Sequence, residues 1–129
     1  MRNEGPVTTE DVYRFLVNQI ESIPHLEALL LLWRSRPEAW APEELARRLF
    51  VPPEAAREAA DDLVRRQLVA ANSGNYHYEA DGGSRDQLVE CVAEVYKHNL
   101  VAVSNLIHAK PGNAVREFAR AFRFTKERN

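Results

Sequence analysis

The chain has 129 residues, of which 45% are hydrophobic and 28% are charged, and its formal net charge is −2. This composition excludes an intrinsically disordered chain, and the length allows one globular domain to bury a core without disulfides or a metal. A single cysteine excludes an internal disulfide framework, and no apolar run is long enough to cross a bilayer. Because the N-terminus also lacks the apolar stretch of a signal peptide, we expect a cytoplasmic protein that does not enter a membrane.

The first two predicted helices cover residues 9–23 and 24–36. In the first, apolar residues recur three or four apart, and two adjacent threonines are able to cap its start. The second begins at Pro24, in the first turn, where proline is tolerated, and Pro37 ends it. The second helix is apolar around most of its circumference, so we expect it at the centre of the domain.

Two shorter helices and a hairpin follow. After a short extended piece, Pro42 opens a third helix, and a fourth is predicted over residues 53–67 beyond a tight turn. Residues 68–71 and 76–78 are predicted to be two strands on either side of a polar turn, and together they predict a β-hairpin. After the Gly-containing break at residues 81–84, helical spacing continues for about 24 residues.

Three segments in this region resemble the bacterial winged helix-turn-helix pattern. They are PEELARRLFV at residues 42–51, PEAAR from residue 53, and LVRRQLV at residues 63–69. In that pattern ELA..L.V precedes the turn and LV..GLV leads into the wing. The resemblance covers residues 24–80 and implies a mainly α, α+β fold with a short β-hairpin wing. The long C-terminal helix after the wing is similar in architecture to the dimerisation helix of PadR-like or ArsR-like regulators.

The resemblance implies a transcriptional regulator that binds DNA as a homodimer. The fourth helix would enter the major groove, and the wing would touch the backbone. The candidate DNA contacts within the winged helix are its arginines, namely Arg47, Arg48, Arg57, Arg65 and Arg66. We expect residues 1–83 to form the winged helix with its N-terminal helix, and residues 84–129 to form a helical extension in the same compact unit.

The outward positions of the fourth helix leave a second hypothesis open. They hold four acidic residues and one arginine, namely Glu54, Arg57, Glu58, Asp61 and Asp62. Pro52 replaces the usual serine or threonine before the helix, and Gln67 replaces the glycine favoured at a left-handed helix end. Because carboxylates repel phosphates, the domain is alternatively a protein-interaction module. Its acidic helix face or basic tail would then bind a protein partner without direct DNA contact.

The long C-terminal helix carries more apolar residues than one stripe requires. Such a surplus predicts packing on two sides, against the chain itself and against a second copy. The predicted dimerisation residues are Leu88, Val92, Val95, Leu100, Val103 and Ile107.

The charge of the chain is unevenly distributed. Residues 1–109 carry 11 basic and 17 acidic side chains, whereas residues 110–129 carry six basic and two acidic ones. Asn113 is positioned to cap a last amphipathic helix with Arg116, Arg120 and Arg123 largely on its polar side. This basic helix either docks on the acidic body or supplies further nucleic-acid contacts.

No catalytic constellation is present in the sequence. A Gly-rich phosphate loop, a G-x-S-x-G elbow and an HExxH motif are all absent. Cys91 and His98 lie two helical turns apart, too far to bind one metal together, although Glu94 and His98 are spaced to do so. The aromatic residues near the wing either line a pocket for a planar effector or form the core beneath it. We therefore expect no enzymatic activity, no cofactor and no metal.

Overall fold

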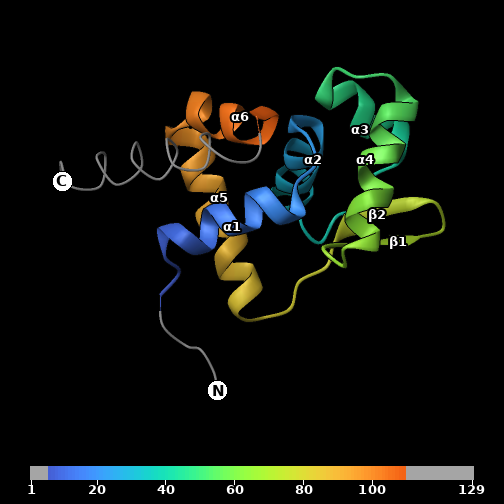
Figure 1. Ribbon diagram of the computed structural model, residues 1–129. Coiled ribbons are helices and arrows are strands. Elements are labelled where there is room, and N and C mark those ends of the chain that lie inside the picture. The colour runs from blue at the N-terminus through green and yellow to red at the C-terminus, as the bar shows by residue number, and fades with distance from the viewer. Residues whose placement is uncertain (1–5, 110–129) are drawn as a thin grey trace. The chain divides into compact units, whose positions relative to one another are not determined.

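The computed structural model describes residues 6–109, which form six α-helices and one antiparallel hairpin (Figure 1). The elements in chain order are α1 (Thr9–Gln19), α2 (Ile23–Arg34), α3 (Pro42–Leu49), α4 (Pro53–Arg65), β1 (Val69–Asn72), β2 (Asn75–Tyr78), α5 (Ser84–His98) and α6 (Leu100–Ala109). They fall into two compact units. Ser22–Ala80 contains α2 to β2, whereas α1 groups with α5 and α6. The sequence-based division of the chain at residue 83 stays a prediction.

In the helical unit, α1 packs against α5 and α6. A reciprocal capping box begins α1, because the Asp11 amide donates to Thr8 Oγ1 at 3.1 Å and the Thr8 amide donates to Asp11 Oδ2 at 3.0 Å. The buried face of the helix holds Val12, Phe15 and Leu16. The spacing of apolar residues in the sequence therefore predicted the side of α1 that packs.

The long helix expected after the wing is divided at Asn99. α5 ends at His98, Asn99 has φ −137° and ψ 48°, and α6 begins at Leu100. The Asn99 carbonyl accepts the Val103 amide at 3.0 Å, so Asn99 also starts the hydrogen bonding of α6. Asparagine leaves a helix readily because its side chain competes for backbone hydrogen bonds. The surplus of apolar positions is thus shared between two helices that run in different directions (Figure 1).

In the second unit, α2 occupies the centre and packs against α3, α4 and β2. Its buried side chains lie on several sides of the helix, as the sequence predicted, and they are Leu26, Ala28, Leu29, Leu30 and Leu32. The Ser22 side chain caps its start by accepting the His25 amide. The packing of this one helix therefore positions the helix-turn-helix and the wing.

α3 and α4 form the helix-turn-helix. Phe50 ends α3 in the left-handed conformation (φ 59°, ψ 46°), and the Val51 amide then donates to the Ala46 carbonyl at 3.1 Å. At the end of α4, Gln67 has φ 65°, and the Leu68 amide donates to the Leu63 carbonyl at 3.0 Å. Gln67 thus adopts the left-handed helix end at which the sequence pattern favours glycine.

The wing is a tight hairpin in which Val69 pairs with Tyr78 and Asn72 pairs with Asn75. Ser73 (φ 55°) and Gly74 (φ 84°) form its two-residue turn, and two positive φ values match the type I′ turn that suits the twist of a hairpin. Trp40 extends the wing as an isolated bridge, since its amide and carbonyl both bond to Tyr76 at 2.8 Å.

The sequence also predicted a C-terminal basic helix and no membrane span. The predicted terminal helix, with Arg116, Arg120 and Arg123, lies outside the described residues. Across residues 6–109, no helix has both the length and the apolar character that a bilayer span requires.

Candidate nucleic-acid-binding face

The outward face of α4 begins with three exposed charged residues, Glu54, Arg57 and Glu58. Further along the helix, Asp61 and Asp62 are half-buried instead. Their side chains contact other parts of the winged helix, so they do not project freely into solvent as the sequence count assumed. The outward face of α4 therefore presents less negative charge to solvent than a count of its acidic residues suggests.

Asp62 binds two of the predicted DNA-contacting arginines. Its Oδ1 lies 3.0 Å from Arg65 Nη2, and its Oδ2 lies 2.9 Å from Arg66 Nε. The Nε2 atom of His25, on α2, lies 3.5 Å from the same Oδ2 atom. Burial would raise the pKa of Asp62, but the hydrogen bonds from Arg66 and Arg65 and the charges of Arg66 and His25 hold it below its usual value. This cluster ties the end of α4 to α2.

Asp61 links α4 to the wing. Its Oδ1 accepts a 2.6 Å hydrogen bond from the hydroxyl of Tyr76, which lies on β2 and is almost fully buried. Burial, together with the hydrogen bond to Asp61 and its charge, raises the pKa of Tyr76 to about 12, while the charge of Arg57 acts in the opposite direction. Because Tyr76 also pairs with Trp40, one residue holds α4, β2 and the loop before α3 together.

The five predicted arginines of the winged helix have different surroundings. Arg65 and Arg66 pair with Asp62, whereas Arg57 is exposed on the outer face of α4. Arg47 and Arg48 are exposed in the last turn of α3. The spacing of Asp62 from Arg65 and Arg66, three and four residues, is the signal that could have identified these ion pairs in the sequence.

Two arginines lie on tryptophan rings near the start of the helix-turn-helix. The Cζ atom of Arg48 is 5.2 Å from the ring centroid of Trp40, and that of Arg36 is 4.3 Å from the centroid of Trp33. Arg36 was not among the predicted contacts. The position of Arg36 three residues after Trp33, at a helix end, was the only signal for this pair in the sequence.

A second feature that the sequence reasoning missed is the exposure of Phe50. Its side chain is 93% exposed in the turn between α3 and α4, in a backbone conformation that strongly favours glycine. Single exposed apolar residues are common on protein surfaces. Here, however, a large aromatic ring occupies both a strained backbone position and the centre of the helix-turn-helix.

The tip of the wing carries polar and uncharged residues, from Asn72 to Gly74, all of them exposed. Tyr76 and Tyr78 point into the core instead and are 4% and 3% exposed. These two tyrosines are therefore part of the core beneath the wing, which was one of the two interpretations considered for the aromatic residues.

The predicted dimerisation residues are largely covered within the chain. Val92, Val95, Val103 and Ile107 are buried, Leu88 is half-buried, and Leu100 is 53% exposed. The neighbouring Val101 is 69% exposed. Of the six, Leu100 and part of Leu88 are therefore accessible to a second copy in this conformation.

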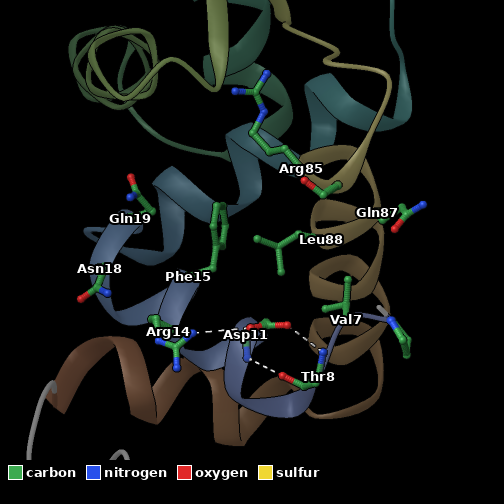
Figure 2. A pocket seen from close by; sticks show the side chains of 12 residues that line it. Val7, Thr8, Asp11, Arg14, Phe15, Asn18, Gln19, Arg85, Gln87 and Leu88 are labelled. Atoms are coloured by element: carbon green, nitrogen blue, oxygen red, sulfur yellow. Dashed lines mark hydrogen bonds and ion pairs between the residues drawn. The ribbon is translucent and has the colours of Figure 1, made fainter. Parts of the chain in front are cut away.

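The helical unit contains an open cavity of about 670 Å³ between α1 and the first turn of α5. Phe15 and Leu88 face one another across it, and Arg14 lies at its edge beside Asp11 (Figure 2). Arg14 pairs there with Glu10 at 3.7 Å and with Asp11 at 3.5 Å. No motif in the sequence had indicated this cavity.

The residues considered for metal binding do not form a site in the part of the chain that is described. His98 Nε2 lies 3.4 Å from Glu94 Oε1, as their spacing predicted, but no group of three potential ligands occurs among residues 6–109. Burial raises the pKa of the Cys91 thiol, as do the charges of Glu90 and Glu94. Cys91 is thus less prone to form a thiolate than an ordinary cysteine.

Comparison with known proteins bears on the fold. No family model matches the chain, and no curated protein matches it. Among solved structures, a MarR family protein from Bacillus stearothermophilus is similar, with a TM-score of 0.51 and 18% sequence identity. The match covers 92% of this chain and 82% of the other. This likeness, together with the order of the elements, confirms the winged-helix fold predicted from the sequence.

Proposed function

We propose that the chain is a transcriptional regulator that binds double-stranded DNA as a homodimer through α4 and the wing. The main support for this proposal is that both aspartates of α4 form contacts within the domain. Asp62 is paired with arginines, and Asp61 accepts the Tyr76 hydroxyl. Because two arginines balance the charge of Asp62, its repulsion of phosphates is reduced. The hydrogen bond from Tyr76 directs the Asp61 carboxylate toward the wing, although it leaves the charge of Asp61 in place.

Arg57 is the residue of α4 that we assign to the major groove. It is exposed in the first half of the helix, the part that contacts base edges in helix-turn-helix proteins. A guanidinium is able to bind guanine through two parallel hydrogen bonds. The asparagines and Ser73 at the wing tip are donors suited to phosphate oxygens, although they bring no charge.

Dimerisation is assigned to the start of α6. Leu100 and Val101 expose adjacent apolar surface there, which a second copy would cover. Two-fold symmetry would present two copies of α4 to the two halves of a palindromic site. This role requires no cofactor and no enzymatic step, and we propose that the protein acts in the bacterial cytoplasm.

The proposal is tested by the fluorescence anisotropy of labelled duplex DNA titrated with the full chain at several salt concentrations. We expect binding that weakens steeply with salt. Arg57→Gln should lower affinity for the preferred sequence about tenfold or more, the range for loss of a bidentate base contact. Glu58→Gln, the matched control one residue away, should raise affinity by removing a negative charge. Absence of duplex binding at low salt would contradict the proposal.

The exposure of Phe50 favours a second candidate function, in which the turn between α3 and α4 binds a protein. Buried aromatic anchors supply much of the affinity at protein interfaces, and arginines are enriched beside them. A photo-crosslinking amino acid at position 50 would distinguish the candidates in cells. One discrete protein adduct would support this function, whereas crosslinks confined to DNA would contradict it.

A further inference from the structure

The end of α2, the loop after it and α3 hold four of the six exposed arginines of residues 22–80. Residues 34–50 carry four arginines and three glutamates. All seven belong to exposed residues, and they are Arg34, Arg36, Glu38, Glu43, Glu44, Arg47 and Arg48. By contrast, the outer face of α4 presents Arg57 between two glutamates.

Two of these arginines are held by tryptophan rings. Arg36 lies over the ring of Trp33, and its Nη1 atom donates to the Trp33 carbonyl. Arg48 lies over the ring of Trp40. A guanidinium stacked on an aromatic face keeps its N–H edge available for an anion, and the stacking limits the number of rotamers that the side chain populates.

The ring of Trp40 is fixed by the fold. The indole Nε1 of Trp40 donates to Ser35 Oγ at 2.9 Å, and Ser35 Oγ donates to the Leu31 carbonyl at 2.8 Å. The backbone amide and carbonyl of Trp40 also both form hydrogen bonds with the backbone of Tyr76. Because Ser35 directly precedes Arg36, the hydrogen bond between Ser35 and Trp40 joins the two stacked pairs through one loop.

The charges of these arginines are not neutralised within the domain. Across residues 6–109, neither Arg36 nor Arg48 makes an ion pair with a carboxylate, whereas Arg65 and Arg66 both bind Asp62. The carboxylate of Glu44, one turn before Arg48, accepts the Ala41 amide at 3.0 Å instead. Arg36 and Arg48 are thus ordered, exposed and cationic.

We infer that Arg36 and Arg48 bind phosphate groups of duplex DNA and supply backbone contacts that α4 lacks. This inference rests on the proposed DNA-binding function and deepens it. In this arrangement the stacked arginines position the domain on the backbone, and the outer face of α4 reads the groove. Their contribution is independent of base sequence, because phosphates carry no sequence information directly.

The test is the slope of log affinity against log salt for a labelled duplex, measured with the full chain. The variants are Arg36→Gln, Arg48→Gln and the double variant, and the matched control is Arg14→Gln, an exposed arginine of α1 outside the winged helix. Each phosphate contact contributes about 0.9 to the slope, so each single variant should reduce its magnitude by about 1 and the double variant by about 2. Raising the salt concentration from 50 to 200 mM weakens DNA binding. For each lost phosphate contact, this weakening should be roughly threefold smaller than in the wild type.

The control should keep the wild-type slope, and equal melting temperatures would show that the exposed substitutions leave the fold intact. The loss of affinity should be the same for preferred and random duplexes. If the wild-type chain binds DNA and the double variant keeps its slope, the inference is overturned while the proposed function stands. If the wild-type chain binds no duplex, both are overturned.

Discussion

Asp62 Oδ2 accepts a hydrogen bond from Arg66 Nε at 2.9 Å across one turn of α4. Arg65 binds the other oxygen of the same carboxylate. Two arginines that a sequence pattern assigns to DNA are therefore engaged within the protein, and so is an acid that would repel DNA. The contacts available to a nucleic acid depend on such internal pairs more than on the number of arginines.

Replacement of Asp62 by Asn should strengthen DNA binding and weaken the fold. The variant loses one negative charge and releases Arg65 and Arg66, so the magnitude of the salt slope should rise by about 1 to 2. The free energy of unfolding should fall by about 1–3 kcal/mol, because hydrogen bonds to a partly buried charged group are lost. Urea denaturation and anisotropy measure the two effects. Weaker DNA binding by a folded Asp62→Asn variant would contradict the interpretation of this cluster.

The Tyr76 hydroxyl should make stability depend on pH at the alkaline end. Its pKa is raised to about 12 in the folded chain, from 10.0 when unperturbed, so its contribution is complete below pH 10 and is lost as the pH rises through 12. Tyr76→Phe should lower stability at neutral pH by about 1–2 kcal/mol, because Asp61 loses its partner. Its stability should also fall less between pH 10 and pH 12.

Urea denaturation of both proteins at pH 8, 10 and 11.5 measures this difference. Asp61→Asn is the matched control, because it removes the charge while it retains an acceptor for the hydroxyl. A constant difference between Tyr76→Phe and the wild type at all three pH values would show that the hydroxyl is not perturbed as described.

Phe50→Gly should stabilise the chain although it removes a large side chain. A non-glycine residue in the left-handed conformation costs about 1–2 kcal/mol, and a ring that is 93% exposed contributes little burial in return. After the greater freedom of glycine in the unfolded chain is subtracted, we expect a gain of about 0.5–1 kcal/mol. Phe50→Ala, which keeps the strain, is the control. A loss of stability in Phe50→Gly as large as that in Phe50→Ala would mean that the ring has a structural role, and it would contradict this prediction.

Substitution of the exposed apolar residues of α6 should convert the dimer into a monomer. Val101→Glu would place a charge in the proposed interface, and Gln87→Glu places the same charge at an exposed position of α5. Light scattering after size exclusion should give a monomer mass for the first variant and a dimer mass for the second and for the wild type. A monomeric wild-type chain at high concentration would contradict the assignment.

The sequence predicted the winged helix well because local signals for each element agree. Pro42 and Pro53 begin α3 and α4, and the Ser73–Gly74 turn joins the two antiparallel strands of the wing. The break at Asn99 was missed because apolar spacing continues across it and asparagine is a weak signal for a helix end. Local pattern therefore predicted the order of the elements but not the path of the last two helices.

The candidate site was less predictable than the fold. Ion pairs such as Asp62 with Arg66 follow helical spacing, so they were accessible to sequence reasoning. The stacking of Arg48 on Trp40 joins a helix to a loop, and it depends on the pairing of Trp40 with Tyr76 across the wing. Which arginines remain free is a property of tertiary structure, and composition does not reveal it.

DNA recognition by α4 is tested most directly by a selection of binding sequences from a random duplex library with the full chain. We predict enrichment of an inverted repeat with half-site centres about 10 base pairs, or a multiple of one helical turn, apart. Enrichment should be lost for Arg57→Gln. Failure of the wild-type chain to enrich any sequence, with no duplex retained at low salt, would contradict DNA binding by this winged helix.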